Sequence, residues 1–270
     1  SMAVIPAFFL CLLNNYGWRG AYTRLGFLVW LIMVPILLLV FRNNPEEVGQ
    51  EMDGSSAGKD SQSQGIRYRE DSFTVKEARR TPAYWIMMMN SALWAMIVTA
   101  VFFNLLSIFD SLGIAPEVAA ATYTTYAAAS LAVQLLLGPL ANKAPLQYFL
   151  LTCMVFLAGG IAVLTVANTP LIAHTYAVLI GISTGMISLV GGTIFARYFG
   201  RAHLGKLRGG VLTAQVAGSS LGPFITGLIY DLSGSFSISL WIFTAILIPA
   251  ALISLRAVQP PTPVSIKRDG

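Results

Sequence analysis

The segment 83–107 reads AYWIMMMNSALWAMIVTAVFFNLLS and contains no charged side chain. A helix of about 20 mostly apolar residues is long enough to cross about 30 Å of membrane hydrocarbon. Six further long, largely apolar runs occupy residues 21–41, 119–140, 148–167, 171–196, 209–229 and 238–255. The sequence therefore predicts seven membrane-spanning helices.

The basic residues are distributed unevenly among the gaps between these runs. Fifteen of the seventeen Lys and Arg residues lie in alternate gaps or in the tail, at 42–80, 143, 197–208 and 256–268. The other two, Arg19 and Arg24, lie around the start of the first run. Short cytoplasmic loops of membrane proteins are enriched in Lys and Arg. The pattern predicts an all-α, polytopic transmembrane bundle in the plasma or inner membrane, with segment 43–81 and the C-terminus in the cytoplasm.

The composition excludes an ordinary soluble domain. Hydrophobic residues make up 56% of the chain and charged residues only 11%, where soluble domains carry about 25% charged residues. The net charge of +5 lies in predicted cytoplasmic loops, where it sets topology and meets anionic headgroups, so we expect no nucleic-acid partner. Cys11 and Cys153 both lie in apolar runs, which gives no indication of a disulfide framework.

The chain divides into four segments. Residues 1–42 hold the end of one helical half, 43–81 a flexible linker of mixed charge, 82–258 six spans with short connections, and 259–270 a tail. Within the linker, residues 73–80 predict a short amphipathic helix on the inner leaflet. Residues 3–13 are apolar but too short to span, and they lack the features of a signal peptide. We therefore expect them to be the outer half of a helix whose beginning is missing from this chain.

Three groups of motifs resemble the major facilitator superfamily, and the resemblance covers essentially the whole chain. GWR at 17–19, ahead of a run that ends in RNNPEEVG at 42–49, resembles the region of its fifth and sixth helices. GPLANK at 138–143 resembles the G-x-L-a-D-r loop between helices eight and nine. YFGRAHLG at 198–205, with GSSLGP at 218–223 and Tyr230-Asp231, resembles the oxalate/formate antiporter and monocarboxylate-transporter branch.

The resemblance implies a fold and a function. It identifies 82–258 as helices seven to twelve, a complete second six-helix half, and the residues before the linker as part of helix five and helix six. It implies a secondary transporter, antiporter or symporter, that moves a small organic solute by alternating access between two halves. An organic anion such as a monocarboxylate is the expectation at the level of the branch. The expected partners are the solute, the lipid bilayer and the missing N-terminal half.

Two positions depart from the pattern of this branch. Its carboxylate carriers place basic residues on helices eight and eleven, where this chain has Gln134 and Gln215. A carboxylate would therefore need a cation from the missing half, or neutral donors such as Tyr126 and Gln215. The acidic position of the loop motif is Asn142, so we expect a weakened gating latch.

Uncharged polar residues at helical spacing provide the candidates for solute binding. Tyr123, Tyr126, Ser130 and Gln134 share one helix face, since they are spaced by three or four residues. Polar groups in hydrocarbon need partners, so such faces point into the bundle or a wet cavity, and structural hydrogen bonds between helices are the alternative. The full candidate set is Asn90, Trp94, Tyr123, Tyr126, Ser130, Gln134, Gln215 and Ser219.

Small residues at every fourth position predict close helix packing. Gly210, Ala214, Gly218 and Gly222 form such a stripe, and packing is favoured there over solute contact. Another stripe runs through Gly181, Gly185, Ser188 and Gly192. The expected packing and gating residues are Gly138, Asn142, Lys143, Gly210, Gly218 and Gly222.

The spans carry no chemistry typical of a membrane enzyme. No Asp, Glu, Lys, Arg or His lies in the middle third of a complete span, and His174 and His203 lack partners at metal-ligand spacing. The sequence contains no G-x-x-x-x-G-K-[ST] phosphate loop, which argues against ATP-driven transport. We expect no enzymatic activity, metal or cofactor. A non-transporting sensor or an intramembrane enzyme on a transporter-like scaffold is the alternative.

Overall fold

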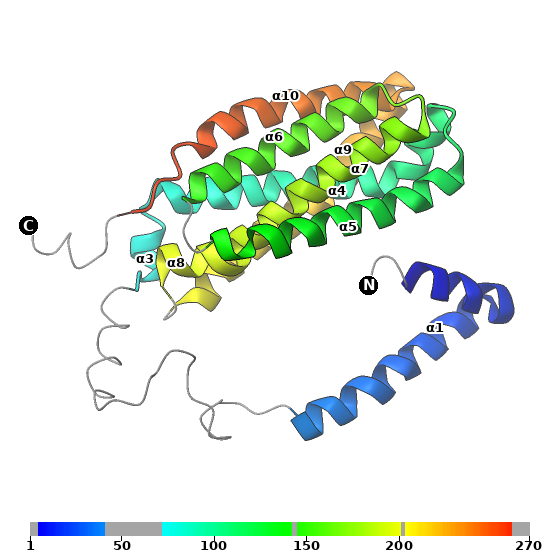
Figure 1. Cartoon of the computed structure of the whole chain (residues 1–270), viewed down its shortest axis with the longest axis horizontal. Helices are drawn as coiled ribbons and strands as arrows, with labels where there is room; N and C mark the ends of the chain where they lie inside the picture. Colours follow the sequence, from blue (N-terminus) through cyan, green and yellow to red (C-terminus); the bar gives the residue numbers. More distant parts are fainter. Residues whose placement is uncertain (1–4, 41–71, 142–144, 201–202, 261–270) are drawn as a thin grey trace, which may run out of the picture. The chain divides into compact units, whose positions relative to one another are not determined.

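The computed structural model describes residues 5–40, 72–141, 145–200 and 203–260, and all the regular elements in these ranges are helices. The chain forms two compact units, Ser1–Gln64 and Gly65–Gly270, which are described separately (Figure 1). Within the described residues, seven helices are long and apolar enough to cross a membrane, which confirms the predicted fold class. They are Asn15–Leu37, Pro82–Ser111, Glu117–Ala141, Leu146–Thr165, Pro170–Phe199, Leu204–Ser233 and Phe236–Ser254.

The first unit contains α1 (Ile5–Val40), which is divided at Gly17. Gly17 has a φ of 65° and a ψ of 173°, a conformation that side-chain-bearing residues rarely adopt, so the chain bends there. Basic and aromatic side chains pair beside the bend, with the Arg24 guanidinium 3.4 Å from the centroid of the Tyr16 ring. The part of α1 after Gly17 contains residues 21–40 of the predicted span 21–41, and residue 41 lies outside the described residues.

The described residues of the second unit form six long helices and three short ones. The long helices are α4 (Pro82–Ser111), α5 (Pro116–Ala141), α6 (Leu146–Thr165), α7 (Pro170–Leu189), α9 (Leu204–Ser233) and α10 (Phe236–Ser254). The short ones are α3 (Val75–Ala78), the π-helix η2 (Val190–Ile194) and α8 (Phe195–Phe199). Several helices extend beyond the predicted apolar runs. Accordingly, α9 includes Lys206 and Arg208, which precede the predicted run at 209.

Helix boundaries follow local signals in the sequence. Pro82 and Pro170 occupy first-turn positions, where the missing N–H costs nothing, and Thr169 caps α7 through its side chain. α9 ends at Gly234, which has a φ of 69°, and the Tyr230 and Phe236 rings stack across the turn with centroids 4.2 Å apart. These turns are tight, so successive spans run in opposite directions.

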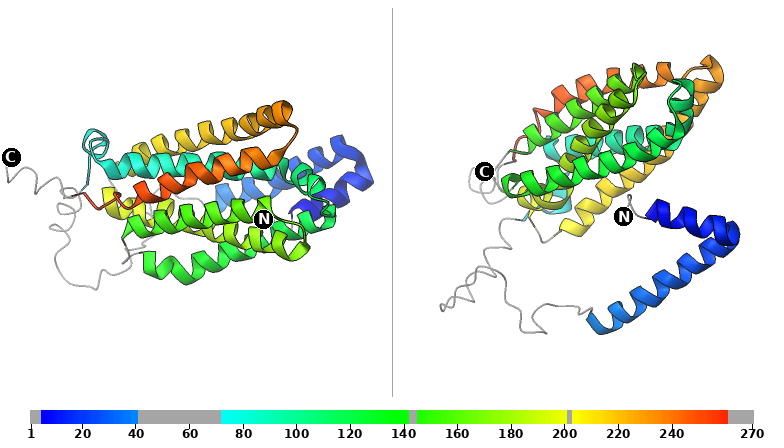
Figure 2. Two further views of the ribbon diagram at one scale, coloured as in Figure 1. Left: turned by 90° about the horizontal axis from the view of Figure 1, so that it is seen from above. Right: turned by 45° about the vertical axis from the view of Figure 1, so that its right-hand side comes forward.

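Most of the extensive helix contacts in the second unit join helices that are not consecutive in the sequence; the contact between α6 and α7 is the exception among the described helices. α4 packs against α9, α5 packs against α7, and α6 lies between α7 and α10 (Figure 1). Figure 2 shows the same helices side by side from two other directions. The core lies between these helices, while α9 is buried over only a small part of its surface.

The predicted run 171–196 contains an irregularity that hydropathy does not reveal. After α7 the helix widens into η2, whose sequence is VGGTI, and then continues as α8. π-helical turns are rare and occur often at functional sites. A Cβ added at Gly191 or Gly192 would meet no heavy atom within 4 Å, so the widened turn leaves open space beside it.

The end of the bundle that carries α3 and α8 is called the inner end here, because the sequence predicts that it faces the cytoplasm. Arg197 of α8 donates to the carbonyl of Ala141 at 3.0 Å, and the Tyr198 hydroxyl accepts the N–H of Leu146 at 3.0 Å. Through these two bonds α8 ties the end of α5 to the start of α6.

The predicted amphipathic helix at 73–80 is shorter than expected and is packed on protein. Only Val75–Ala78 is helical, and it begins with a capping box between Thr74 and Glu77. Phe73 is 2% exposed, its N–H donates to the Phe199 carbonyl at 3.0 Å, and the two rings meet edge to face. This apolar side chain is therefore buried by α8 rather than by lipid.

Candidate functional site

Aromatic side chains of α4 and α5 meet in the half of the bundle away from α8. Phe102 of α4 lies edge to face on the Tyr126 ring at 4.9 Å and beside the Tyr123 ring at 5.3 Å. The Tyr123 hydroxyl donates to the Phe102 carbonyl at 3.3 Å. The two tyrosines predicted on one face of this helix therefore do lie together.

Tyr176 of α7 joins this group, and sequence reasoning missed it. Its side chain is 1% exposed, and it lies on α7, which packs against the helix α5 that carries Tyr123 and Tyr126. Its hydroxyl oxygen is buried and has no hydrogen-bond partner among the residues that the structure describes. A tyrosine in the second turn of a span is usual at a membrane interface, so no signal in the sequence marked it as interior.

The α5–α7 contact contains one further polar pair. Near the start of α7, the Thr125 hydroxyl lies 2.9 Å from Nδ1 of His174. The sequence placed His174 near the outer end of its span, but it did not indicate this partner on another helix.

The remaining polar residues of α5 bond within their own helix. Gln134 is exposed, and its Nε2 donates to the Ser130 hydroxyl at 3.2 Å and to the Ser130 carbonyl at 3.3 Å. Ser130 itself is buried. The predicted face thus runs from a buried aromatic part at Tyr126 to an exposed amide at Gln134.

Asn90 and Trp94 of α4 both have buried polar atoms. The Asn90 Nδ2 donates to the Ser254 hydroxyl of α10 at 2.7 Å. The Asn90 Oδ1 and the Trp94 Nε1 are buried and have no partner within the described parts of the chain. Each of these atoms can therefore still accept or donate one hydrogen bond.

Gln215 and Ser219 lie on α9, away from the aromatic group. Both are half-buried, and Ser219 donates to the Val216 carbonyl of its own helix at 2.8 Å. α9 packs mainly on α4 and less on α10, whereas Tyr126 lies at the α5–α7 contact. The candidate residues of the sequence therefore fall into three places: the aromatic group, the buried pair on α4, and α9.

The predicted packing glycines differ in their surroundings. A Cβ at Gly218 would lie 2.5 Å from the Ala92 carbonyl oxygen, and one at Gly222 would collide with that of Met96, so α9 approaches the α4 backbone closely. Gly210 faces the Tyr84 hydroxyl. A Cβ at Gly138 would meet nothing within 4 Å. Asn142 and Lys143 lie outside the described residues.

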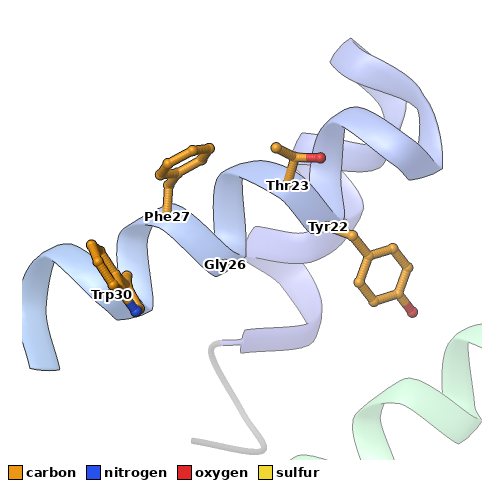
Figure 3. Close-up of a pocket in the computed structure, with 5 residues that line it drawn as sticks. All are labelled: Tyr22, Thr23, Gly26, Phe27 and Trp30. Atoms are coloured by element: carbon orange, nitrogen blue, oxygen red, sulfur yellow. The ribbon is translucent and has the colours of Figure 1, made fainter.

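Two surface hollows lie away from all of these residues. A groove of about 390 Å³ on α1 is lined by Tyr22, Thr23, Gly26, Phe27 and Trp30. Figure 3 shows Thr23, Phe27 and Trp30 along one side of this helix, with Tyr22 pointing away from them. The second, of about 230 Å³, lies at the outer ends of α4, α6, α9 and α10 and includes Ser111, Thr165 and Tyr230.

A comparison with models of protein families shows to which family the chain belongs. The model of the Major Facilitator Superfamily matches residues 101–270, from within α4 to the end of the chain. The chain belongs to the Major Facilitator Superfamily. Members of this superfamily are transporters, so the chain is a multi-pass membrane transporter. No curated protein matches it.

The candidate site of this superfamily member is uncharged. Phenol, amide, indole and hydroxyl groups supply its polar atoms, and the described residues contain no cluster of three or more His, Cys, Asp and Glu side chains that could hold a metal. Asp110 and Glu117, the acidic residues at the outer ends of α4 and α5, are exposed. Such a site can bind a solute through hydrogen bonds and aromatic contact, but it offers no ion pair.

Proposed function

We propose that this protein is a secondary active transporter that moves a small organic solute by alternating access. In this proposal residues 82–258 form one six-helix half, which works with a second half around a site near the middle of the membrane. The observation that carries the proposal is the group of interior polar side chains on α4 and α5, in a chain that belongs to a transporter family.

The helix contacts support alternating access. α9 meets α4, and α7 meets α5, through glycines that lie against backbone oxygens of the partner helix. Contacts of this kind leave few interlocked side chains to separate when helices shift against each other. The widened turn η2 gives the inner part of the α7–α8 helix a point at which its direction can change.

Two observations support a class of solute: the resemblance of the motifs to a transporter branch, and the lack of charge among the candidate binding residues. The motifs at 198–205 and 218–223 resemble the oxalate/formate and monocarboxylate branch, so an organic acid is the first class to test. The candidate solute-binding residues offer neutral donors only, such as the Tyr126 hydroxyl and the Gln215 amide. We therefore propose that a carboxylate would be paired with a cation outside the described residues, or bound in its protonated form.

The experiment is uptake by the complete transporter in proteoliposomes. Radiolabelled lactate, formate, oxalate and the neutral lactamide are tested with and without a proton gradient. We expect saturable uptake of at least one probe, with counterflow driven by the same probe inside. Absence of uptake and counterflow for all four, with protein shown to be folded by thermal unfolding, would contradict the proposal and favour a sensor.

Two substitutions test the proposed site. Tyr126→Phe and Gln215→Leu each remove hydrogen-bonding groups, and loss of one bond should raise the half-saturation concentration about two- to twelvefold. Membrane abundance should stay near that of the wild type. If both variants transport with unchanged kinetics at normal abundance, these residues do not bind the solute.

A further inference from the structure

The hydroxyl of Tyr176 is an unexplained polar group in the interior of the bundle. It lies on α7, which packs against the helix α5 that carries Tyr123 and Tyr126, and it has no hydrogen-bond partner among the described residues. Burying a hydroxyl without a hydrogen bond is unfavourable, and a phenylalanine would fill the same space without that cost. A transiently bound hydrogen-bonding partner therefore explains a tyrosine at this position more easily than packing does.

Two nearby hydroxyls already use their hydrogens. Tyr123 donates to the Phe102 carbonyl, and Thr184 donates to the Ile180 carbonyl at 2.8 Å. The group therefore offers a free donor at Tyr176 and acceptor lone pairs on the tyrosine oxygens.

The charged residues on the helices around Tyr176 lie at helix ends or are absent from the described parts of these helices. His174, two residues before Tyr176, lies beside Thr125, while Asp110 and Glu117 are exposed at helix ends. No Lys or Arg lies in the described parts of α4, α5 or α7. A solute anion buried here would have no opposite charge beside it, which is costly in a membrane interior.

We propose that the Tyr176 hydroxyl binds an uncharged polar group of the solute, one that carries both an acceptor and a donor. A hydroxyl, a carboxamide and a protonated carboxylic acid all meet this requirement. The solute accepts from Tyr176 and donates to the oxygen of Tyr123 or Tyr126, beside the Phe102 ring. Phe102 and Tyr123 are partly exposed, so this group of side chains extends from the buried Tyr176 to the surface of the described unit. The inference rests on the proposed transport function.

The test compares two buried tyrosines that differ in their partners. Tyr176→Phe removes a hydroxyl without a partner, whereas Tyr84→Phe removes one that donates to the Leu207 carbonyl at 3.4 Å. Both side chains are almost fully buried. Thermal unfolding of the complete transporter in detergent and uptake of lactate and lactamide in proteoliposomes are measured for each variant.

We expect Tyr176→Phe to unfold at the wild-type temperature or above it, and to raise the half-saturation concentration for a transported probe about two- to twelvefold. Tyr84→Phe should unfold at a lower temperature with unchanged half-saturation. Lactamide should compete with lactate in the wild type, and its inhibition constant should rise in Tyr176→Phe by the same factor.

Four outcomes would overturn the inference. A fall in unfolding temperature in Tyr176→Phe with unchanged uptake would show a structural hydroxyl. Unchanged stability and unchanged half-saturation, in a wild type that does transport, would remove Tyr176 from the site and leave the proposed function intact. If the lactate anion inhibits uptake at high pH and lactamide does not, the solute group that Tyr176 binds is not uncharged, and the inference is wrong. Failure of the wild type to transport any probe would overturn the function and the inference together.

Discussion

The amide of Asn90 donates to the hydroxyl of Ser254 across 2.7 Å, and both side chains are fully buried. This bond joins the first third of α4 to the last residue of α10, so it lies towards the inner end of the bundle. Asn90 is therefore held by another helix through its nitrogen while its Oδ1 has no partner in the described structure. One side chain can thus both join helices and offer an acceptor.

The role of this bond in stability is tested by Ser254→Ala. The substitution leaves a buried amide donor unpaired, which should lower the free energy of unfolding by about 1 kcal/mol, since hydrogen bonds between membrane helices average about 0.6 and reach about 1.7 kcal/mol. The change in the free energy of unfolding is measured by unfolding the protein in mixed detergent. Ser220→Ala is the control, because Ser220 is exposed and bonds only to Val216 of its own helix. Equal stability of the two variants would show that the Asn90–Ser254 bond contributes nothing.

The close approach of α9 to α4 is tested by Gly222→Ala. The added Cβ would collide with the Met96 carbonyl oxygen, so the helices must separate and we expect a loss of about 1–3 kcal/mol. Gly227→Ala on the same helix is the matched control, because a Cβ there meets nothing within 4 Å. It should be neutral or slightly stabilising, since alanine favours a helix more than glycine does. Similar unfolding of both variants would contradict the close contact.

The docking of segment 72–78 on α8 is tested by Phe73→Ala. The change removes a ring that is buried against Phe199, so the segment should open more often. Amide hydrogen exchange of a peptide that covers residues 72–81 should become about tenfold faster or more, with little change in α5 and α7. Lys76→Ala, at an exposed position on α3, should leave exchange unchanged. Slow exchange in Phe73→Ala would show that the ring does not hold the segment.

The predicted orientation is tested by cysteine labelling. We expect Ser55→Cys to react with an impermeant maleimide only after permeabilisation, because the distribution of basic residues predicts that 43–81 is cytoplasmic. Asn168→Cys, exposed between α6 and α7, should react in intact cells. The background carries Cys11→Ala and Cys153→Ala, although Cys153 is fully buried. Efficient labelling at position 55 in intact cells would contradict the predicted topology.

The sequence predicted the spans well because the length and hydropathy of a membrane helix are local properties. Each predicted run lies within or largely within one observed span, and the family resemblance at the superfamily level is confirmed. The stripe at Gly218 and Gly222 correctly indicated a close helix contact, since spacing by four residues defines one helix face. The branch and the identity of the solute stay predictions.

The pairing of side chains between helices could not be predicted in the same way. The bond between Thr125 and His174 and the position of Tyr176 depend on which helices are neighbours and how each is rotated. The burial of Phe73 depends on the position of α8. That helix follows a π-helical turn, which the sequence VGGTI does not predict. Spacing within α5 grouped Tyr126 with Gln134, yet one is buried between helices and the other is exposed.

The packing of α4 on α9 and of α5 on α7 has a consequence for biosynthesis. Ribosomes deliver helices in chain order, so α5 enters the bilayer two spans before its partner, and α4 four spans before its own. Until then the backbone oxygens of Ala92 and Met96 face lipid where α9 will later lie. A pause in translation between α7 and α9 therefore leaves an uncovered strip on α4, and this interval is where a nascent chain is most exposed to mispairing and to membrane proteases.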